Sequence, residues 1–223
     1  QDASLSSGSA YSYEARVVDA AGNASDPSNS LGFTLNTDTI GQTVAILQVH
    51  DDVDPVTGSV GQNGTTNDDT PRLSGSVSIA LGAGEVIVLY RDGKKLDGFA
   101  TVTGTTWTYQ DSGLVEEKAY KYEARVVNAA GNEGNISSPY VINFDKTAPT
   151  ATAAIDSYHD DFAPQTGDFQ SGSTTNDTTP LLNGTVVGAL GAGEAVVVYR
   201  DGEKLGNATV TGTTWTYQDG NLA

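Results

Sequence analysis

Acidic side chains in this 223-residue sequence gather in short segments that also carry Asn, Gly and Thr, the composition of turns. Carboxylate, amide and backbone oxygens are what Ca²⁺ binds, about six to eight at a time. No EF-hand loop is present, so the pattern predicts calcium sites assembled from several turns. The candidate metal ligands are Asp19, Asn23, Asp38, Asp51, Asp52, Asp68, Glu85, Asn128, Asp145, Asp160, Asp161, Asp177 and Glu194.

Catalytic chemistry has little material in this sequence. There is no Cys and there are only two His, so thiol catalysis, disulfides and zinc–thiolate sites lack their residues. Asp51 and Asp52 could be taken for the carboxylate pair of a glycosidase. The acidic segments, however, recur along the chain and lie in turns rather than in one cleft. We therefore predict that the chain is not an enzyme.

Charge and hydropathy narrow the range of partners. The sequence has 28 Asp and Glu against 11 Lys and Arg, a formal net charge of −17 at pH 7. Such a surface repels nucleic-acid phosphates and anionic membranes, and it attracts cations. The apolar runs are also too short to cross a bilayer. We expect no nucleic-acid partner and no direct membrane insertion.

Internal repetition sets the domain organisation. The segment YEARVV at residues 13–18 recurs unchanged at 122–127, which is 109 positions later, and GTTWTYQD at 104–111 recurs at 212–219. A period of this length is a whole domain rather than a solenoid unit. The predicted parts are the C-terminal half of one repeat at 1–37, a complete repeat at 38–147, and the N-terminal part of a third repeat at 148–223.

The complete repeat carries a series of short alternating segments. In its sixth segment, Tyr120, Tyr122, Ala124 and Val126 share one face, and charged residues occupy the other. Seven such strands in one repeat predict an all-β fold of immunoglobulin-like antiparallel β-sandwiches in tandem, about 109 residues per repeat. The expected strands are residues 43–49, 71–78, 85–91, 100–103, 107–110, 120–128 and 140–145.

Three local patterns add detail to this fold. Asp92-Gly93 is a signal for a tight hairpin turn. Leu114 and Tyr120 have the spacing of the tyrosine corner found at the E–F junction of such sandwiches. Trp107 could be a sugar-stacking platform, but a Trp at the start of a short alternating strand favours a place in the core.

The sandwich topology brings the acidic turns together. The B–C and F–G turns lie at the end where the chain begins, and the A–B segment lies at the end where it leaves. We therefore expect Glu194 to approach Asp145, with a residue of the Asp19 type beside them, while Asp51 and Asp52 face the same kind of junction. Carboxylates at one junction repel each other unless a cation neutralises them, which predicts Ca²⁺ as the cofactor.

Several motifs in this order resemble the immunoglobulin-like tandem repeats, or extender domains, of giant bacterial surface adhesins of the Bap and RTX type. They are YSYEARVVDAAGN at 11–23, FDKTAP at 144–149, TNDTTP at 175–180, LGAGE at 190–194, VYRDG at 198–202 and GTTWTY at 212–217. The resemblance implies type I secretion to the bacterial cell surface. It also implies calcium-stiffened spacer domains that project a distal binding region for attachment or biofilm formation.

Two readings of the function remain open. One is this calcium-stiffened extracellular spacer, whose partners are the neighbouring repeats of the same polypeptide. The alternative is a repeat that itself binds a glycan, a host protein or another copy of itself. A binding module should expose aromatic side chains in a loop that is not repeated, and only Tyr140 and Tyr158 come near that description.

The two incomplete repeats also complement each other. Residues 1–35 supply two strands, which do not hold together alone in water, and residues 150–223 supply the other five. We therefore expect head-to-tail self-complementation, in which Tyr11 and Tyr13 of one molecule pack over Trp215 of another.

Overall fold

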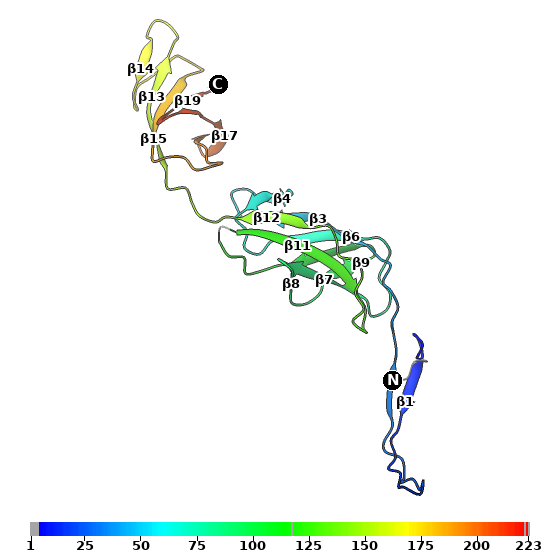
Figure 1. Cartoon of the computed structure of the whole chain (residues 1–223). Helices are drawn as coiled ribbons and strands as arrows, with labels where there is room; N and C mark the ends of the chain where they lie inside the picture. The colour runs from blue at the N-terminus through cyan, green and yellow to red at the C-terminus, as the bar shows by residue number, and fades with distance from the viewer. Residues whose placement is uncertain (1–4, 117, 221, 223) are drawn as a thin grey trace. The chain divides into compact units, whose positions relative to one another are not determined.

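The computed structural model describes residues 5–116, 118–220 and 222, and the regular elements in this part of the chain are all β-strands (Figure 1). Internal contacts divide the chain into two compact units that meet between Thr147 and Ala148. None of the described residues forms a helix long and apolar enough to cross a membrane. The all-β, immunoglobulin-like fold expected from the sequence is confirmed.

Two five-stranded sheets build the complete repeat. The strands of the first sheet are β3 (Val44–Asp51), β4 (Gly58–Val60), β6 (Arg72–Val77), β9 (Thr101–Thr103) and β10 (Thr106–Gln110). Those of the second are β5 (Gly64–Thr66), β7 (Val86–Arg91), β8 (Lys94–Lys95), β11 (Lys118–Val127) and β12 (Tyr140–Phe144). The orders are β4-β3-β6-β10-β9 and β5-β12-β11-β7-β8, and all pairs are antiparallel except β5 with β12.

The strands expected in this repeat are all present, with ends that shift by at most two residues. β4, β5 and β8 were not expected. β4 and β5 lie inside the polar segment 51–70, where Gly and Asn mask the strand pattern. β5 owes its place to parallel pairing with β12, a contact between residues about 80 positions apart that local sequence does not encode.

The core lies between the two sheets. The predicted alternation in β11 is confirmed, because Tyr122, Ala124 and Val126 are fully buried while the charged residues between them are not. Trp107 is also buried, so its core assignment is confirmed. A side chain at Gly75 would place Cβ 2.4 Å from the Trp107 ring, so only glycine lets the indole lie flat on β6.

Two turns behave as their residues predict. Asp92 and Gly93 both have positive φ, 54° and 77°, as a primed hairpin turn requires. The Tyr120 hydroxyl accepts a hydrogen bond from the Val115 backbone N–H at 2.5 Å, which forms the expected tyrosine corner. The same bond links the Tyr11 hydroxyl to the Ser6 N–H at 2.6 Å.

The second unit repeats part of this design. Its five-stranded sheet, in the order β14-β13-β15-β19-β18, consists of β13 (Thr152–Asp160), β14 (Gly167–Phe169), β15 (Leu181–Val187), β18 (Thr209–Thr211) and β19 (Thr214–Gln218). A separate pair consists of β16 (Val197–Arg200) and β17 (Glu203–Asn207). Its core is small and is built around Val186, Val196, Val198 and Trp215.

A β-hairpin precedes the complete repeat. Its strands are β1 (Ala10–Tyr13) and β2 (Leu31–Thr34), which pair antiparallel with Tyr13 opposite Leu31. The rings of Tyr13 and Phe33 stack at a centroid distance of 5.6 Å, yet both side chains are more than two-fifths exposed. These hairpin side chains are therefore less buried than the core residues of the complete repeat.

Candidate functional site

A pair of buried carboxylates lies at the C-terminal end of the complete repeat. Asp51 ends β3, and Thr66 ends β5. The Thr66 hydroxyl donates to Asp51 Oδ2 at 2.6 Å and accepts from the Asp68 backbone N–H at 3.1 Å, so one threonine joins both acids. Asp51 is 4% exposed and Asp68 is 0% exposed. We call this arrangement, two buried aspartates joined by one threonine, an acid pair; here it consists of Asp51, Asp68 and the joining Thr66.

The second unit contains the same arrangement. The Thr175 hydroxyl donates to Asp160 Oδ2 at 2.6 Å and accepts from the Asp177 N–H at 2.9 Å. Asp160 is 1% exposed and Asp177 is 5% exposed. The repetition of the sequence therefore extends to side-chain geometry. The same hydrogen bonds form at equivalent positions in both units.

One carboxylate oxygen in each pair has no hydrogen-bond partner among the residues that the structure describes. Asp68 Oδ1 accepts from the Thr70 N–H at 2.7 Å and from the Thr70 hydroxyl, whereas Asp68 Oδ2 is buried without a hydrogen bond, as is Asp177 Oδ2. Among the described residues no Lys or Arg forms an ion pair with these acids. A buried, unpaired carboxylate oxygen costs free energy, and a cation bound there would offset that cost.

Asp145 lies beside the acid pair of its own repeat. Its backbone N–H donates to the Thr66 carbonyl at 3.0 Å, while its carboxylate is exposed and accepts from the Thr147 N–H. Asp52 and Asp161, which follow the buried Asp51 and Asp160 in the sequence of their own units, are both exposed. The A–B segment therefore does lie where the chain leaves the repeat, as the topology predicted.

Two other predicted ligands, Glu85 and Asn128, lie in turns of the complete repeat. Glu85 Oε2 accepts from the Gly82 N–H at 2.7 Å and from Gln42 Nε2 at 2.6 Å, which closes the B–C turn. In the F–G turn, Asn128 Oδ1 accepts from two backbone N–H groups, and Asn132 Nδ2 donates to Asn36. In the second unit, Glu194 closes its turn in the same way as Glu85.

Asp19 and Asn23 are the counterparts of that F–G turn in the first repeat. Asp19 Oδ2 accepts from Asn23 Nδ2 at 2.8 Å, and its Oδ1 accepts from the Asn23 N–H at 2.8 Å. These hydrogen bonds, the side-chain bond from Asn23 first, lower the pKa of Asp19 below its usual range. Asp38 accepts from the Ser7 hydroxyl at 2.8 Å. The Asp19 oxygens thus hold their own turn, whereas Asp38 holds a residue 31 positions away.

The predicted ligands thus fall into separate sets. No group of three Asp, Glu or His close enough to hold a metal occurs within the described ranges. A cation at an acid pair would therefore take its remaining oxygens from carbonyl groups, hydroxyls or water, all of which suit Ca²⁺. Glu194 belongs to one unit and Asp145 to the other, and their expected approach stays a prediction.

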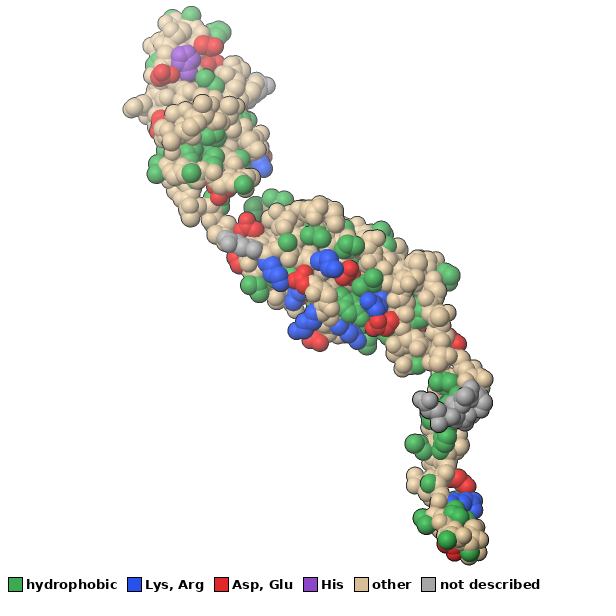
Figure 2. Space-filling model, in the orientation of Figure 1, with side chains coloured by type: hydrophobic (Ala, Val, Ile, Leu, Met, Phe, Trp, Pro, Cys, Tyr) green, Lys and Arg blue, Asp and Glu red, His purple; other side chains and the backbone are tan. Residues whose placement is uncertain are grey.

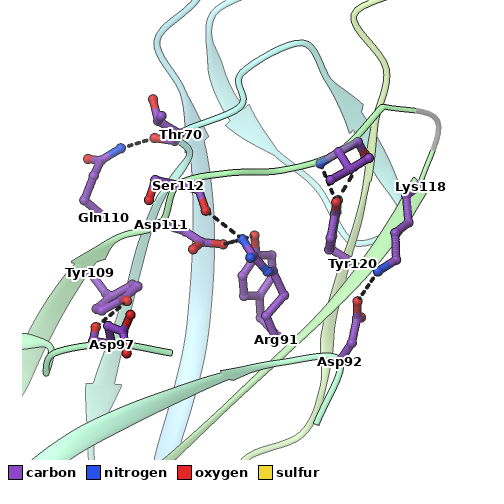
Figure 3. A network of polar contacts seen from close by, with 12 residues as sticks. Thr70, Arg91, Asp92, Asp97, Tyr109, Gln110, Asp111, Ser112, Lys118 and Tyr120 are labelled. Carbon is purple, nitrogen blue, oxygen red and sulfur yellow. Dashed lines mark hydrogen bonds and ion pairs between the residues drawn. The ribbon is translucent and has the colours of Figure 1, made fainter. Parts of the chain in front are cut away.

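The sequence reasoning missed another buried acid. Asp111 is 3% exposed and accepts from Arg91 Nη1 at 2.8 Å (Figure 3). It also accepts from the Tyr122 hydroxyl at 2.6 Å. Burial, followed by the nearby Asp111 carboxylate, raises the pKa of Tyr122 well above its usual value. Asp219 repeats the ion pair with Arg200. The sequence did contain a signal for this ion pair, because YRDG, which contains the arginine, and TYQD, which contains the aspartate, both recur in the second unit.

Basic side chains form a contrasting surface. Figure 2 shows that Lys and Arg gather on one face of the complete repeat, over β8 and β11. Much of this charge is balanced locally, because Lys118 pairs with Asp92, Lys121 with Glu123, and an Arg–Glu pair joins β11 to the following turn. Much of the face is therefore a set of partly exposed ion pairs, which contribute little to stability.

Comparison with known proteins supports the immunoglobulin-like fold of the complete repeat. Exoglucanase B of Cellulomonas fimi is 31% identical over 217 residues, which cover 96% of this chain and 18% of that protein. The chain thus spans less than a fifth of the relative's length. Residues 41–146 match the family described as the bacterial Ig-like domain. The complete repeat is therefore an immunoglobulin-like domain of bacterial type.

Proposed function

We propose that the chain is a calcium-stiffened spacer segment of an extracellular bacterial surface adhesin, and that it projects a distal binding region for attachment or biofilm formation. The acid pair carries the proposal. It occurs twice at equivalent positions, it buries two carboxylates joined by one hydroxyl, and it leaves one oxygen without a hydrogen bond. A repeated scaffold with the same acid pair in each unit suits a spacer better than an enzyme.

Calcium would act on stability and stiffness together. A ligand held only by the native state stabilises that state by about 2.7 kcal/mol at a hundredfold excess over its dissociation constant. The acid pair lies next to Asp145 at the C-terminal end of the complete repeat. Order gained there is gained beside residues 145–149, which we call the linker. Loss of the cation should loosen the same segment.

Calorimetric titration and thermal unfolding of the whole chain test this. Calcium should raise the melting temperature, and Asp68→Asn should remove the calcium response of the complete repeat. That response can be followed through Trp107 in a Trp215→Phe background, because the chain has only two Trp. Asp69→Asn is the matched control, since Asp69 is half-exposed and pairs with Lys146. A chain whose melting temperature ignores calcium would sink the proposal.

Small-angle scattering tests the stiffening. The maximum dimension of the chain should change when a chelator removes calcium. Asp145→Ala should reproduce part of that change, because Asp145 begins the linker, whereas Glu123→Ala on the outer face of β11 should not. Identical scattering curves for these two variants would contradict the assignment of Asp145.

The resemblance to an exoglucanase favours a second candidate. The same tandem domains could separate the parts of a secreted, glucan-degrading enzyme. In that case the chain would still be a spacer, without activity of its own. Incubation of the chain with insoluble β-glucan separates the readings: neither hydrolysis nor binding is expected of a spacer, and binding would favour a repeat that itself holds a glycan.

A further inference from the structure

One loop of the complete repeat differs from its counterpart in the second unit. Residues 97–99 read Asp-Gly-Phe, where the second unit has only Gly206 and Asn207 between the matching Leu and Ala. Gly206 and Asn207 belong to the strand β17, whereas residues 97–99 form no strand and Gly98 has a φ of 75°. The extra residue therefore turns a strand end into a loop, which we call loop 97–99.

This loop presents an aromatic ring on a firm support. The N–H groups of Leu96 and Ala100, on either side of the loop, donate to carbonyl groups of β7 at 2.9 and 3.0 Å. Phe99 between them is 57% exposed, and the Lys95 ammonium lies over its ring at 5.7 Å from the centre. A ring held in this way loses little conformational entropy when a ligand stacks on it.

Phe99 borders a cavity of about 370 Å³, a volume within the range of about 300 to 1,000 Å³ that is typical of small-molecule sites. The floor of the cavity is the outer face of β6, β9 and β10. Gln110 lies opposite Arg72 in the sheet, and Thr108 lies opposite Thr101 in the next row. Amide, guanidinium and hydroxyl groups therefore face the same space as the aromatic ring.

The cavity carries one charged side chain of each sign. Arg72 and Asp97 both line it, and neither forms an ion pair among the residues that the structure describes. The wall around them is fixed, because the Tyr109 hydroxyl donates to the Asp97 carbonyl at 2.7 Å and the Gln110 amide donates to the Thr70 carbonyl (Figure 3). A ligand that accepts from the guanidinium and donates to the carboxylate satisfies both charges, and an alcohol hydroxyl does both.

We propose that this cavity binds a neutral saccharide, with the C–H face of one sugar ring stacked on Phe99 and its hydroxyl groups hydrogen-bonded to Arg72 and Asp97. A sugar ring has an apolar face and a rim of hydroxyl groups, which match the two parts of the cavity. A polyanion fits less well, because Asp97 and the net charge of −17 repel it.

Phe99 also meets the condition expected of a binding module, an exposed aromatic side chain in a loop that is not repeated. Tyr140 does not meet it, because it lies within β12 and its hydroxyl donates to the Val60 carbonyl at 2.6 Å. Tyr158 lies within β13. The proposal goes beyond the spacer role, since it gives one repeat a ligand of its own, and it does not involve calcium.

An oligosaccharide array followed by calorimetric titration of the whole chain tests the proposal. The array carries neutral gluco-, manno-, galacto- and xylo-oligosaccharides beside sialylated and uronate-bearing ones. The chain should bind a neutral member, with and without a chelator, and should bind one ligand per chain, because the second unit has Leu181 in place of Arg72 and no match for Phe99. Binding of acidic members alone, or of none, would overturn the proposal.

Variants locate the site. Phe99→Ala and Arg72→Leu should each raise the dissociation constant by about tenfold, while the thermal unfolding of the complete repeat stays the same because both side chains are exposed. Asn207→Ala, at the matching turn of the second unit, is the control and should bind as the wild-type chain does. Exchange of residues 97–99 for the Gly-Asn of the second unit should abolish binding. Unchanged affinity in Phe99→Ala would refute this placement of the saccharide.

Discussion

The same six residues behave differently in two parts of this molecule. YEARVV at 122–127 forms the second half of a ten-residue strand whose apolar side chains are buried. YEARVV at 13–18 leaves the strand after its first residue, and its two Val side chains are more than half exposed. The hairpin partner is present in both places, so the difference comes from β7 and the facing sheet. The length of the strand formed by this segment therefore depends on tertiary contacts and not on its local sequence alone.

The largest expected effect concerns the tyrosine of that segment. Tyr122→Ala should lower the free energy of unfolding of the complete repeat by about 3 to 5 kcal/mol, because it removes a fully buried aromatic ring. Tyr13→Ala should leave it unchanged in dilute solution. Denaturant unfolding followed by Trp107 fluorescence, in the Trp215→Phe background, measures both. Similar losses in the two variants would mean that the hairpin is already packed.

Removal of the buried acid should rank next. Asp111→Ala should cost about 2 kcal/mol, because it takes a charged acceptor from both Arg91 and Tyr122. Asp219→Ala should cost less, since Arg200 is 39% exposed and its ion pair is weakened by solvent. The fluorescence of the Trp in each unit reports the two values separately, and a larger loss for Asp219→Ala would reverse the comparison.

Alkaline pH should destabilise the complete repeat through Tyr122. Because burial raises the pKa of Tyr122, the folded repeat keeps its phenol protonated while the unfolded chain loses that proton near pH 10. This stabilisation is fully present below about pH 10 and is lost above it, by about 1.4 kcal/mol per pH unit. Tyr122→Phe should flatten this dependence in alkaline unfolding curves of the complete repeat, and an unchanged slope would contradict the assignment to Tyr122.

The smallest expected effect is at the tyrosine corner. Tyr120→Phe should cost about 1 kcal/mol, because it removes the hydrogen bond from the Val115 N–H. Tyr11→Phe breaks the equivalent bond to Ser6 in the hairpin and should leave the unfolding of the complete repeat unchanged. Thermal unfolding at neutral pH is sufficient to compare them.

The sequence predicted the fold well because repetition and alternation are local signals. The strands around Tyr122, Trp107 and Asp92-Gly93 follow from side-chain period and turn chemistry. The candidate site was predicted less completely. Asp51 and Asp68 were named as ligands, but Thr66, which joins them, was not, because β5 exists only through its long-range pairing with β12. Asp111 was missed because an acid that ends a strand looks like any other turn residue.

The parallel pairing of β5 with β12 also bears on mechanical load. β12 is the last strand of the complete repeat, and its neighbours β5 and β11 hold it on both sides. A pull on the C-terminal end of this repeat acts along β12, so the hydrogen bonds on either flank are sheared together instead of opening one after another. Single-molecule stretching should show an abrupt rupture at high force, and gradual unzipping would contradict this. In a segment that is pulled at its two ends, this strand pair of only three residues would raise the force needed to unfold the repeat.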